Sequence, residues 1–386
     1  MSKRKKWILI SIPAAIVIIL SISIIFNKTY RTTFESLPDL DQQMLTELSN
    51  IYKQFEQSPD ILWNEDYAFD TKPLLLVRTN KDRGIFRKEA FAVNVPLQNS
   101  LFAQEIKMPE SMGLPKVYRV SRFAPSTLYT WMPINFGTVQ IQDTETMFYR
   151  YYPRMFSDPE LYFDFSSFLL HEGFHIFKQK EWSYDADETW WIDEDYPVNE
   201  EQYALMGMEY KLLDLAMAES RPEKVKPYLH DWTVVRNYRY AKWPLLQGET
   251  GTEAIEGTAR YVEYRYNELM GRKLTVLAAE QPPYHATFMQ VFDFVADGQM
   301  QQEFLKRSMR YETGAALGML MDKANIPWKN EMEDTPDQPG MTQYDILNDY
   351  FDLKKAADEA KIKELKQEHD YKKLLEQGRK IANGTV

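Results

Sequence analysis

The sequence predicts an α+β protein with an N-terminal transmembrane helix, a small mixed or antiparallel β-sheet and, after the sheet, a mainly helical domain. Three observations support this prediction. An uncharged segment follows a basic N-terminus, short strand-like segments separated by Pro, Gly and Asn fill residues 61–155, and helical periodicity dominates from residue 156 onward. The 386 residues are 44% hydrophobic and 27% charged, which is typical of a globular protein with a sizeable core.

The N-terminal segment is expected to anchor the chain in the cell membrane. Residues 1–6 form a basic stub, and residues 7–26 carry no charge and are long enough to span a bilayer as a helix. The basic stub should remain in the cytoplasm, which places the rest of this single-pass protein outside it. A cleaved signal peptide is the alternative, but no small-residue cleavage motif follows Phe26.

Composition narrows the possible functions. The net charge is −11 although the first 31 residues contribute only basic side chains, so the chain after them is strongly acidic. An acidic surface argues against nucleic acid as a partner. The absence of cysteine excludes a disulfide scaffold, a thiolate metal site and a cysteine nucleophile. The sequence does not specify an oligomeric state.

The region between the anchor and the helical domain contains one expected helix and several expected strands. Residues 27–60 are expected to form a linker and an amphipathic helix that starts at Pro38-Asp39. Residues 61–155 form the β-rich subdomain. Its strand candidates are residues 74–78, 117–121, 127–132 and 138–142.

Residues 156–330 are expected to form the helical domain, and residues 331–386 a linker and a charged C-terminal helix. The first helix of the domain has an opening signal at Asp158-Pro159-Glu160. A third helix is expected between a Thr250/Glu253 capping box and Gly271. The other expected helices cover residues 199–219, 300–324 and 345–383.

The most informative motif is H-E-x-x-H at residues 171–175. On a helix, His171 and His175 lie on the same face, one turn apart, so both imidazoles can bind one metal ion. Glu172 is then placed to take a proton from the attacking water, which predicts zinc peptidase chemistry. Gly173 lowers helix propensity by about 1 kcal/mol, which suggests that a strand or a substrate approaches closely at this position.

A catalytic zinc site needs a third protein ligand, and a glutamate from a later helix is the natural candidate. Glu256 is favoured because small residues surround it in the segment A-I-E-G-T-A-R-Y, which allows close helix packing. The other candidates in the sequence are Glu194, Glu200, Glu201, Glu209 and Glu253.

Two segments extend this pattern into a family resemblance. E-G-x-A-x-Y, beginning at Glu256, resembles the third-ligand motif of the gluzincin metallopeptidases, and Y-E-T-G-A, beginning at Tyr311, resembles a motif of the aminopeptidase N family. The resemblance implies a zincin-like domain with Zn²⁺ bound by His171, His175 and Glu256. It also assigns proton transfer to Glu172 and oxyanion stabilisation to Tyr311. His230 and His285 are alternative groups for the oxyanion.

The sequence therefore predicts a membrane-anchored, zinc-dependent peptidase that acts on a peptide or protein substrate outside the cytoplasm. The G-x-M-E-N segment with which aminopeptidase N relatives bind the substrate's free amine is absent, which favours cleavage within chains. A non-catalytic zincin-like domain with a binding or sensory role is the alternative.

Overall fold

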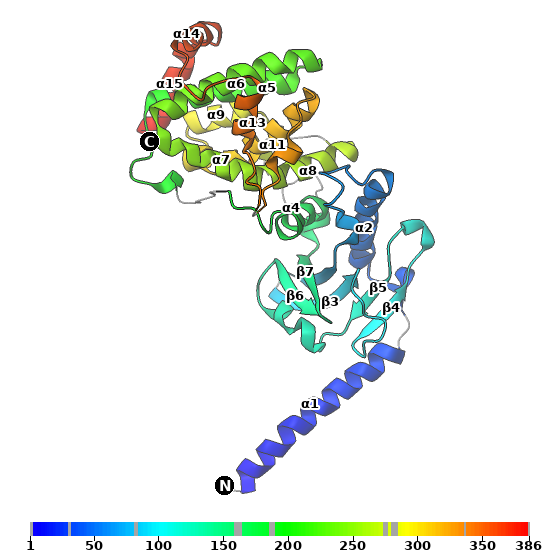
Figure 1. Ribbon diagram of the computed structural model, residues 1–386. Coiled ribbons are helices and arrows are strands. Elements are labelled where there is room, and N and C mark those ends of the chain that lie inside the picture. The colour runs from blue at the N-terminus through cyan, green and yellow to red at the C-terminus, as the bar shows by residue number, and fades with distance from the viewer. Residues whose placement is uncertain are drawn as a thin grey trace. The chain divides into compact units, whose positions relative to one another are not determined.

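The computed structural model describes residues 3–29, 32–80, 84–157, 164–184, 190–272, 277–278, 285–335 and 337–384 (Figure 1). The described chain is a mixed α+β protein with one seven-stranded sheet, which confirms the predicted fold class at this level. It forms two compact units. One extends to Phe177, and the other begins at Lys178 and includes the short segment Leu62–Asn64.

The first unit begins with α1 (Lys3–Thr29). Its segment Ser11–Thr29 is long and apolar enough to cross a membrane, and it is the one candidate span in the described part of the chain. The large side chains of this segment, from Ile12 to Phe26, are mostly exposed. Burial within the protein therefore does not account for their apolar character, and the expected anchor lies within this helix.

The sheet of the first unit has the strand order β1-β4-β5-β3-β2-β7-β6. β2 pairs parallel with β7, as β1 does with β4, and the remaining pairs are antiparallel, so the sheet is mixed. The strands are β1 (Thr32–Thr33), β2 (Leu74–Asn80), β3 (Gly84–Val93), β4 (Ala103–Lys107), β5 (Val117–Val120), β6 (Phe136–Ile141) and β7 (Thr144–Tyr151).

Alternation along β7 assigns its side chains to the two faces of the sheet. Phe148 belongs to an apolar cluster on one face, together with side chains such as Leu75 and Tyr118. Tyr149 and Tyr151 lie on the other face, where their rings contact Phe165 at centroid distances of 5.7 and 6.1 Å. Phe165 is the first residue of the helix that carries the histidine motif, so this face of the sheet supports that helix.

The same face also supports α2 (Asp39–Gln57), which starts directly after Pro38 as predicted. The buried side chains of α2 include Met44, Leu48 and Ile51, at the helical spacing seen in the sequence. Tyr151 donates a hydrogen bond to the buried Asp41 carboxylate at 2.7 Å. This contact joins the first turn of α2 to strand β7.

Three of the four predicted strands are present, as β2, β5 and β6, but the strand predicted at residues 127–132 is wrong. That segment belongs to the 3₁₀ helix η4 (Pro125–Trp131). Ala124, Thr127 and Thr130 are buried, a spacing of three that matches the 3₁₀ repeat and not the alternation of a strand. Threonine and aromatic residues favoured the strand prediction, but local hydrogen bonds from the Thr127 and Thr130 hydroxyls to backbone carbonyls hold the helical turns.

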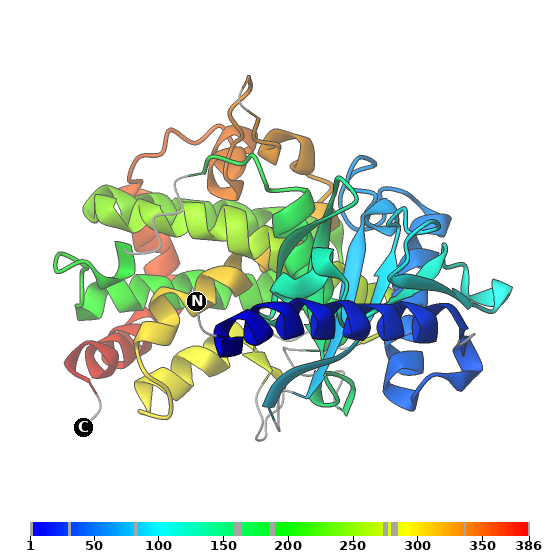
Figure 2. The same ribbon diagram turned by 90° about the horizontal axis from the view of Figure 1, so that it is seen from below.

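The second unit is built around α5 (Glu200–Ala218) and α6 (Pro222–Lys242), which pack side by side (Figure 2). The Asn199 side chain accepts a hydrogen bond from the Gln202 N–H and caps α5 where the sequence predicts its start. The helices that follow are α7 (Gly248–Thr252), α8 (Thr258–Leu269), α9 (Phe288–Ala296), α10 (Glu303–Lys306), α11 (Ser308–Lys323), α12 (Lys329–Met332), α13 (Gln343–Tyr350), α14 (Glu359–Glu368) and α15 (Tyr371–Asn383).

The predicted capping box at Thr250 is wrong. Helical structure begins earlier, and the Thr250 hydroxyl donates to the carbonyl of Gln247 instead of accepting from a later N–H. A π-helical turn, η7 (Glu253–Gly257), joins α7 to α8. Gly271, with a φ of +66°, follows the end of the helix as predicted.

The C-terminal region also differs from a linker followed by a single helix. Asp334 accepts hydrogen bonds from the Gly340 N–H at 2.9 Å and the Ser183 hydroxyl at 2.8 Å, so the predicted linker is tied into the second unit. The charged region after it forms α13, α14 and α15. Of these, α15 packs along α5.

Candidate metal centre

The H-E-x-x-H motif lies on α4 (Phe165–Phe177), as the sequence predicts. The Asp164 carboxylate caps this helix by accepting hydrogen bonds from the N–H groups of Ser166 and Ser167, both at 3.1 Å. The opening signal predicted at Asp158-Pro159-Glu160 lies outside the described residues.

Aromatic side chains of the first unit hold α4 in place. Tyr67 lies edge-on against Phe174, at a centroid distance of 5.3 Å, and its hydroxyl donates to the carbonyl of Leu170 at 3.5 Å. A Cβ atom at Gly173 would lie 2.6 Å from the ring of Phe69, so a larger residue would require this ring or α4 to shift. The close approach expected at Gly173 therefore comes from the Phe69 ring and not from a strand.

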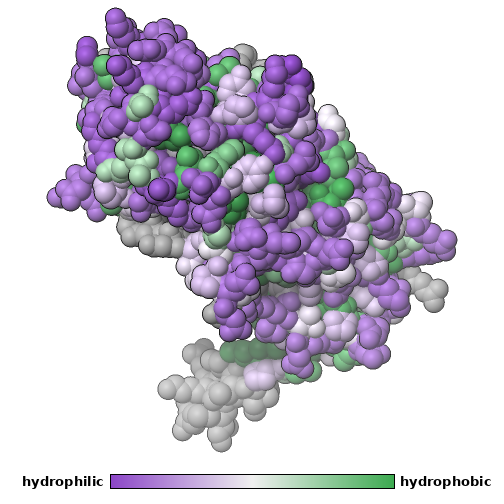
Figure 3. Space-filling model, turned by 45° about the horizontal axis from the view of Figure 1, so that its top comes forward, coloured by the Kyte–Doolittle hydropathy of each residue, from purple (hydrophilic) through white to green (hydrophobic). Residues whose placement is uncertain are grey.

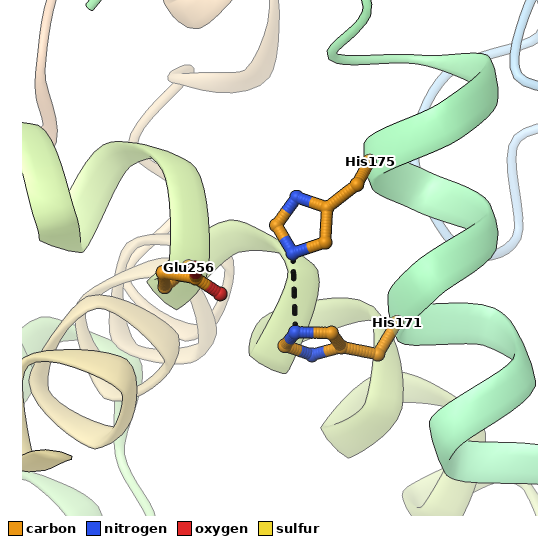
Figure 4. A group of neighbouring side chains, drawn as sticks. All are labelled: His171, His175 and Glu256. Carbon is orange, nitrogen blue, oxygen red and sulfur yellow. Dashed lines mark hydrogen bonds between the residues drawn. The ribbon is translucent and has the colours of Figure 1, made fainter. Parts of the chain in front are cut away.

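The two motif histidines face each other. Their Nε2 atoms are 3.1 Å apart, and the rings are nearly perpendicular with centroids 4.8 Å apart (Figure 4). Two nitrogens bound to one tetrahedral zinc ion lie roughly 3.3 Å apart, given Zn–N bonds of about 2.05 Å. His171 and Glu172 are buried, and His175 is half-buried. The spacing of the pair fits a shared metal ion.

Glu256 is the third member of the candidate group. One ring nitrogen from each histidine and one carboxylate oxygen of Glu256 all lie within 4.8 Å of one another (Figure 4). In the described part of the chain, this is the group of His, Asp and Glu side chains compact enough to hold a metal ion. The donor set of two imidazoles and one carboxylate is the one found in thermolysin-type zinc sites.

Gln179 ties the chain just beyond α4 to the segment that carries Glu256. Its side-chain amide donates to the carbonyl of Ile255 at 2.8 Å and to the hydroxyl of Thr258 at 2.7 Å. These two acceptors flank Glu256 in the sequence, and all of these contacts lie within the second unit. The sequence analysis did not identify Gln179. Its position four residues after His175, in step with the histidine pair, was the available signal.

The π-helical turn η7 places Glu256 in an unusual backbone setting. Such turns insert an extra residue into a helix and are frequent at functional sites. A Cβ atom at Gly257 would lie 2.6 Å from the Cα of Gly314 on α11, so two backbones cross where both residues are glycine. The close packing expected from the small residues after Glu256 is thus present, and it brings together the two segments that carry the family resemblance.

Tyr311 lies on α11, one turn before Gly314, and is half-buried. The guanidinium of Arg307 lies over its ring, 5.6 Å from the centroid. The alternative oxyanion groups differ in their settings: His230 contacts Asp231 at 3.0 Å, and the side chain of His285 lies outside the described residues. The role of Tyr311 remains a prediction.

The other acidic candidates for the third ligand have different surroundings. Glu200 pairs with Arg379 and Glu201 with Lys242 near the surface, and Glu194 lies in an exposed turn. Glu209 and Glu253 belong to a fully buried cluster of three glutamates and three arginines. We call this set the arginine cluster: Glu209, Glu249, Glu253, Arg236, Arg239 and Arg310.

Charge is balanced within the arginine cluster. Glu253 accepts from Arg236 at 3.0 Å and lies 3.4 Å from Arg310, and Glu209 accepts from Arg239 at 2.7 Å. Burial by itself raises the pKa of Glu249, but the ion pairs with Arg239 and Arg310 outweigh burial and lower its pKa. Glu209 and Glu253 are thus paired with buried arginines, and Glu256 is the candidate that is grouped with the two histidines.

A second buried group of charges follows Tyr311 in the sequence. Glu312 accepts from the Arg260 guanidinium at 3.2 Å and from the Tyr264 hydroxyl, and Glu263 accepts from Arg260 at 2.5 Å. Two carboxylates share one guanidinium here. Burial raises the pKa of Glu312 to about 7, although Arg260 and the hydrogen bond from Tyr264 oppose the shift.

Comparison of the chain with models of known protein families, with characterised proteins and with solved structures found no match in any of the three. The candidate centre therefore rests on its own residues and their geometry.

Proposed function

We propose that this protein is a membrane-anchored zinc peptidase of the gluzincin type, with its catalytic domain outside the cytoplasm. The observation that carries the proposal is the grouping of His171, His175 and Glu256. The buried Glu172 beside this group and the apolar helix α1 add support. The basic residues that precede the span favour a cytoplasmic N-terminus.

In this proposal, His171, His175 and Glu256 would hold Zn²⁺. When bound, the ion would polarise the scissile carbonyl and lower the pKa of water toward about 7. A carboxylate among the three ligands leaves the ion with one net positive charge, which keeps the centre electrophilic.

The chain's own residues would then move protons and bind charge. Glu172 would accept a proton from water at its carboxylate and pass it to the departing amine. The Tyr311 hydroxyl would donate a hydrogen bond to the oxyanion, where one such donor typically contributes about 3–4 kcal/mol. The half-buried setting of Tyr311 leaves part of its side chain open to a substrate.

Glu172→Gln tests this proposal because the amide keeps the size of the side chain and removes its basicity. We expect wild-type protein in detergent to contain one zinc per chain and to cleave a peptide library. The variant should keep its zinc and lose activity by a factor of about 10² to 10⁴. Zinc is measured by atomic emission and cleavage by mass spectrometry.

A metal-free wild-type protein would contradict the proposal. Zinc-loaded wild-type protein that cleaves no library member would instead favour the non-catalytic zincin-like domain. Glu194→Gln is a suitable control, because Glu194 lies in an exposed turn and its substitution should change neither zinc content nor cleavage.

A further inference from the structure

Large apolar side chains are exposed together on loops of the first unit. Leu128, Tyr129 and Met132 each keep more than half of their surface exposed, at 54%, 51% and 53%. The face of the molecule that Figure 3 shows is largely hydrophilic, with smaller hydrophobic areas among the polar residues. We define the loop patch as the exposed apolar side chains of this region: Leu101, Phe123, Leu128, Tyr129, Trp131 and Met132.

Backbone contacts make the loop patch one surface. The N–H of Ser121 donates to the carbonyl of Phe102 at 2.8 Å, which joins the segments that carry Leu101 and Phe123. The indole N–H of Trp131 donates to the carbonyl of Arg122 at 3.2 Å, which joins η4 to the same place. The three segments that carry these exposed apolar side chains are therefore hydrogen-bonded to one another.

The loop patch is also held firmly from beneath. The buried guanidinium of Arg150 donates to the carbonyl of Thr130 at 2.6 Å and to that of Met132. The inner residues Thr127 and Thr130 are fully buried, while their neighbours Leu128 and Tyr129 point outward. Exposed apolar side chains that gather on one surface mark a site of contact with a protein, a membrane or a ligand.

The candidate membrane span contacts this same surface. The hydroxyls of Ser23 and Ser121 are 2.6 Å apart, and Lys28 donates to the carbonyl of Ala103 at 3.2 Å. Ser121 lies two residues before Phe123, and Ala103 lies two residues after Leu101. The C-terminal end of α1 thus contacts the rest of the first unit at the edge of the loop patch.

This contact fixes the depth of the loop patch relative to a bilayer. Ser23 lies within the apolar span Ser11–Thr29, about 9 Å along the helix axis from its end at Thr29. The headgroup layer on each side of a bilayer is roughly 5–8 Å thick. A group that touches Ser23 is therefore at the level of the headgroups or below it whenever α1 crosses the membrane.

We propose that the loop patch rests in the headgroup layer of the leaflet from which α1 emerges, so that the first unit lies against the membrane. Tyr and Trp are the side chains enriched at this depth, because their rings are apolar and their polar atoms still find partners there. Leu and Met side chains then reach the upper acyl chains. The inference rests on the membrane anchor of the proposed function and does not depend on zinc or catalysis.

The chain contains no cysteine, so a single introduced cysteine can carry a fluorophore. We would label Leu128→Cys and, separately, Met132→Cys in the full chain and reconstitute it into phosphatidylcholine vesicles. Lipids with a quencher near the headgroup are expected to quench both labels. Gln57→Cys is the control, because Gln57 is exposed at the far end of α2 and its label should stay unquenched.

A label at Ile18→Cys, in the middle of α1, tests the membrane anchor separately from the membrane contact of the loop patch. Quenching at Ile18 by deep lipid quenchers, with no quenching at Leu128 and Met132, would overturn the proposed membrane contact of the loop patch and would leave the proposed anchor in place. Absence of quenching at Ile18 would overturn both. Labels at Leu128 and Met132 that are shielded from water but not quenched by lipid would indicate a protein partner and would also overturn the proposal.

Discussion

Glu253 and Glu256 lie on the same π-helical turn, yet their surroundings differ. Glu253 is fully buried and contacts two arginines and the Thr313 hydroxyl. Glu256 is half-buried and is grouped with the two histidines of α4. The partners of a carboxylate therefore decide whether it supports the packing of the protein or is available for chemistry. A carboxylate paired with guanidinium groups supports the helix packing, and a carboxylate beside two imidazoles offers a third ligand atom for a cation.

The largest difference between the two positions is expected when each glutamate is substituted in turn. Glu256→Gln should abolish stoichiometric zinc binding and leave the fold intact, because it removes a ligand from a half-buried position. Glu253→Gln should keep zinc in the folded protein and lower the free energy of unfolding by roughly 3–5 kcal/mol, because it leaves buried arginines uncompensated. Zinc analysis and urea denaturation measure the two effects. Zinc loss by Glu253→Gln alone, at full stability, would reverse the assignment.

Substitutions at the crossing of Gly257 and Gly314 measure how rigidly the π-helical turn is held. Gly257→Ala should lower the free energy of unfolding by about 1–3 kcal/mol, because the added methyl meets the Gly314 backbone, which cannot rotate away.

Gly207→Ala is the matched control in α5. Its methyl would meet the side chains of Phe292 and Leu374, which can shift, and the gain in helix propensity offsets part of the cost. Denaturation curves of both variants measure the difference. Equal stability of the two would show that the crossing is not tight.

The smallest expected effect concerns Glu312, where two carboxylates share one guanidinium. Its pKa of about 7 in the folded protein is above the usual 4.5, so the folded state keeps a proton that the unfolded chain releases. The contribution of this raised pKa to the free energy of unfolding is fully present below about pH 4.5 and is lost as the pH rises through about 7.

Wild-type protein should therefore lose stability relative to Glu312→Gln between about pH 5 and pH 8, by an amount on the order of 1–3 kcal/mol. Urea denaturation at several pH values measures this difference. Parallel pH profiles for the two proteins would exclude the raised pKa. Burial also raises the pKa of Asp41 to about 6 and lowers the pKa of the half-buried His369, but both groups are unchanged in the two proteins and cancel in the comparison.

Much of the architecture could be predicted from the spacing of apolar residues and from residues that start or end helices. The apolar N-terminal helix, α2, α5, the helical segment of the H-E-x-x-H motif and three strands all have regular apolar spacing or clear start signals, and the structure places these segments where the sequence predicts. The predictions that failed involve competing local hydrogen bonds. Thr127 and Thr130 form 3₁₀ turns instead of a strand, and Thr250 bonds backward to Gln247.

The candidate centre was only partly predictable for a similar reason. Helical spacing relates His171 to His175 directly, but it says nothing of an acid far along the chain. The arginine cluster could not be predicted, because Arg236, Arg239 and Arg310 belong to no recognisable sequence motif. Only the folded structure shows that arginines of this cluster form ion pairs with Glu209 and Glu253. The exclusion of Glu209 and Glu253 as candidate metal ligands therefore depends on the structure and could not be made from the sequence.

The docking of α15 on α5 has a consequence for the order in which the chain folds. Gly378 packs against the carbonyl of Glu200, and Lys211 reaches the carbonyl of His369, so α5 is completed by residues made much later. Ribosomes add about 5–20 residues per second, and roughly 150 residues separate the two helices, so α5 waits on the order of 10–30 s for its partner. During that interval the surface of α5 that α15 later covers is accessible to chaperones and proteases. The chain is therefore most susceptible to them late in its synthesis.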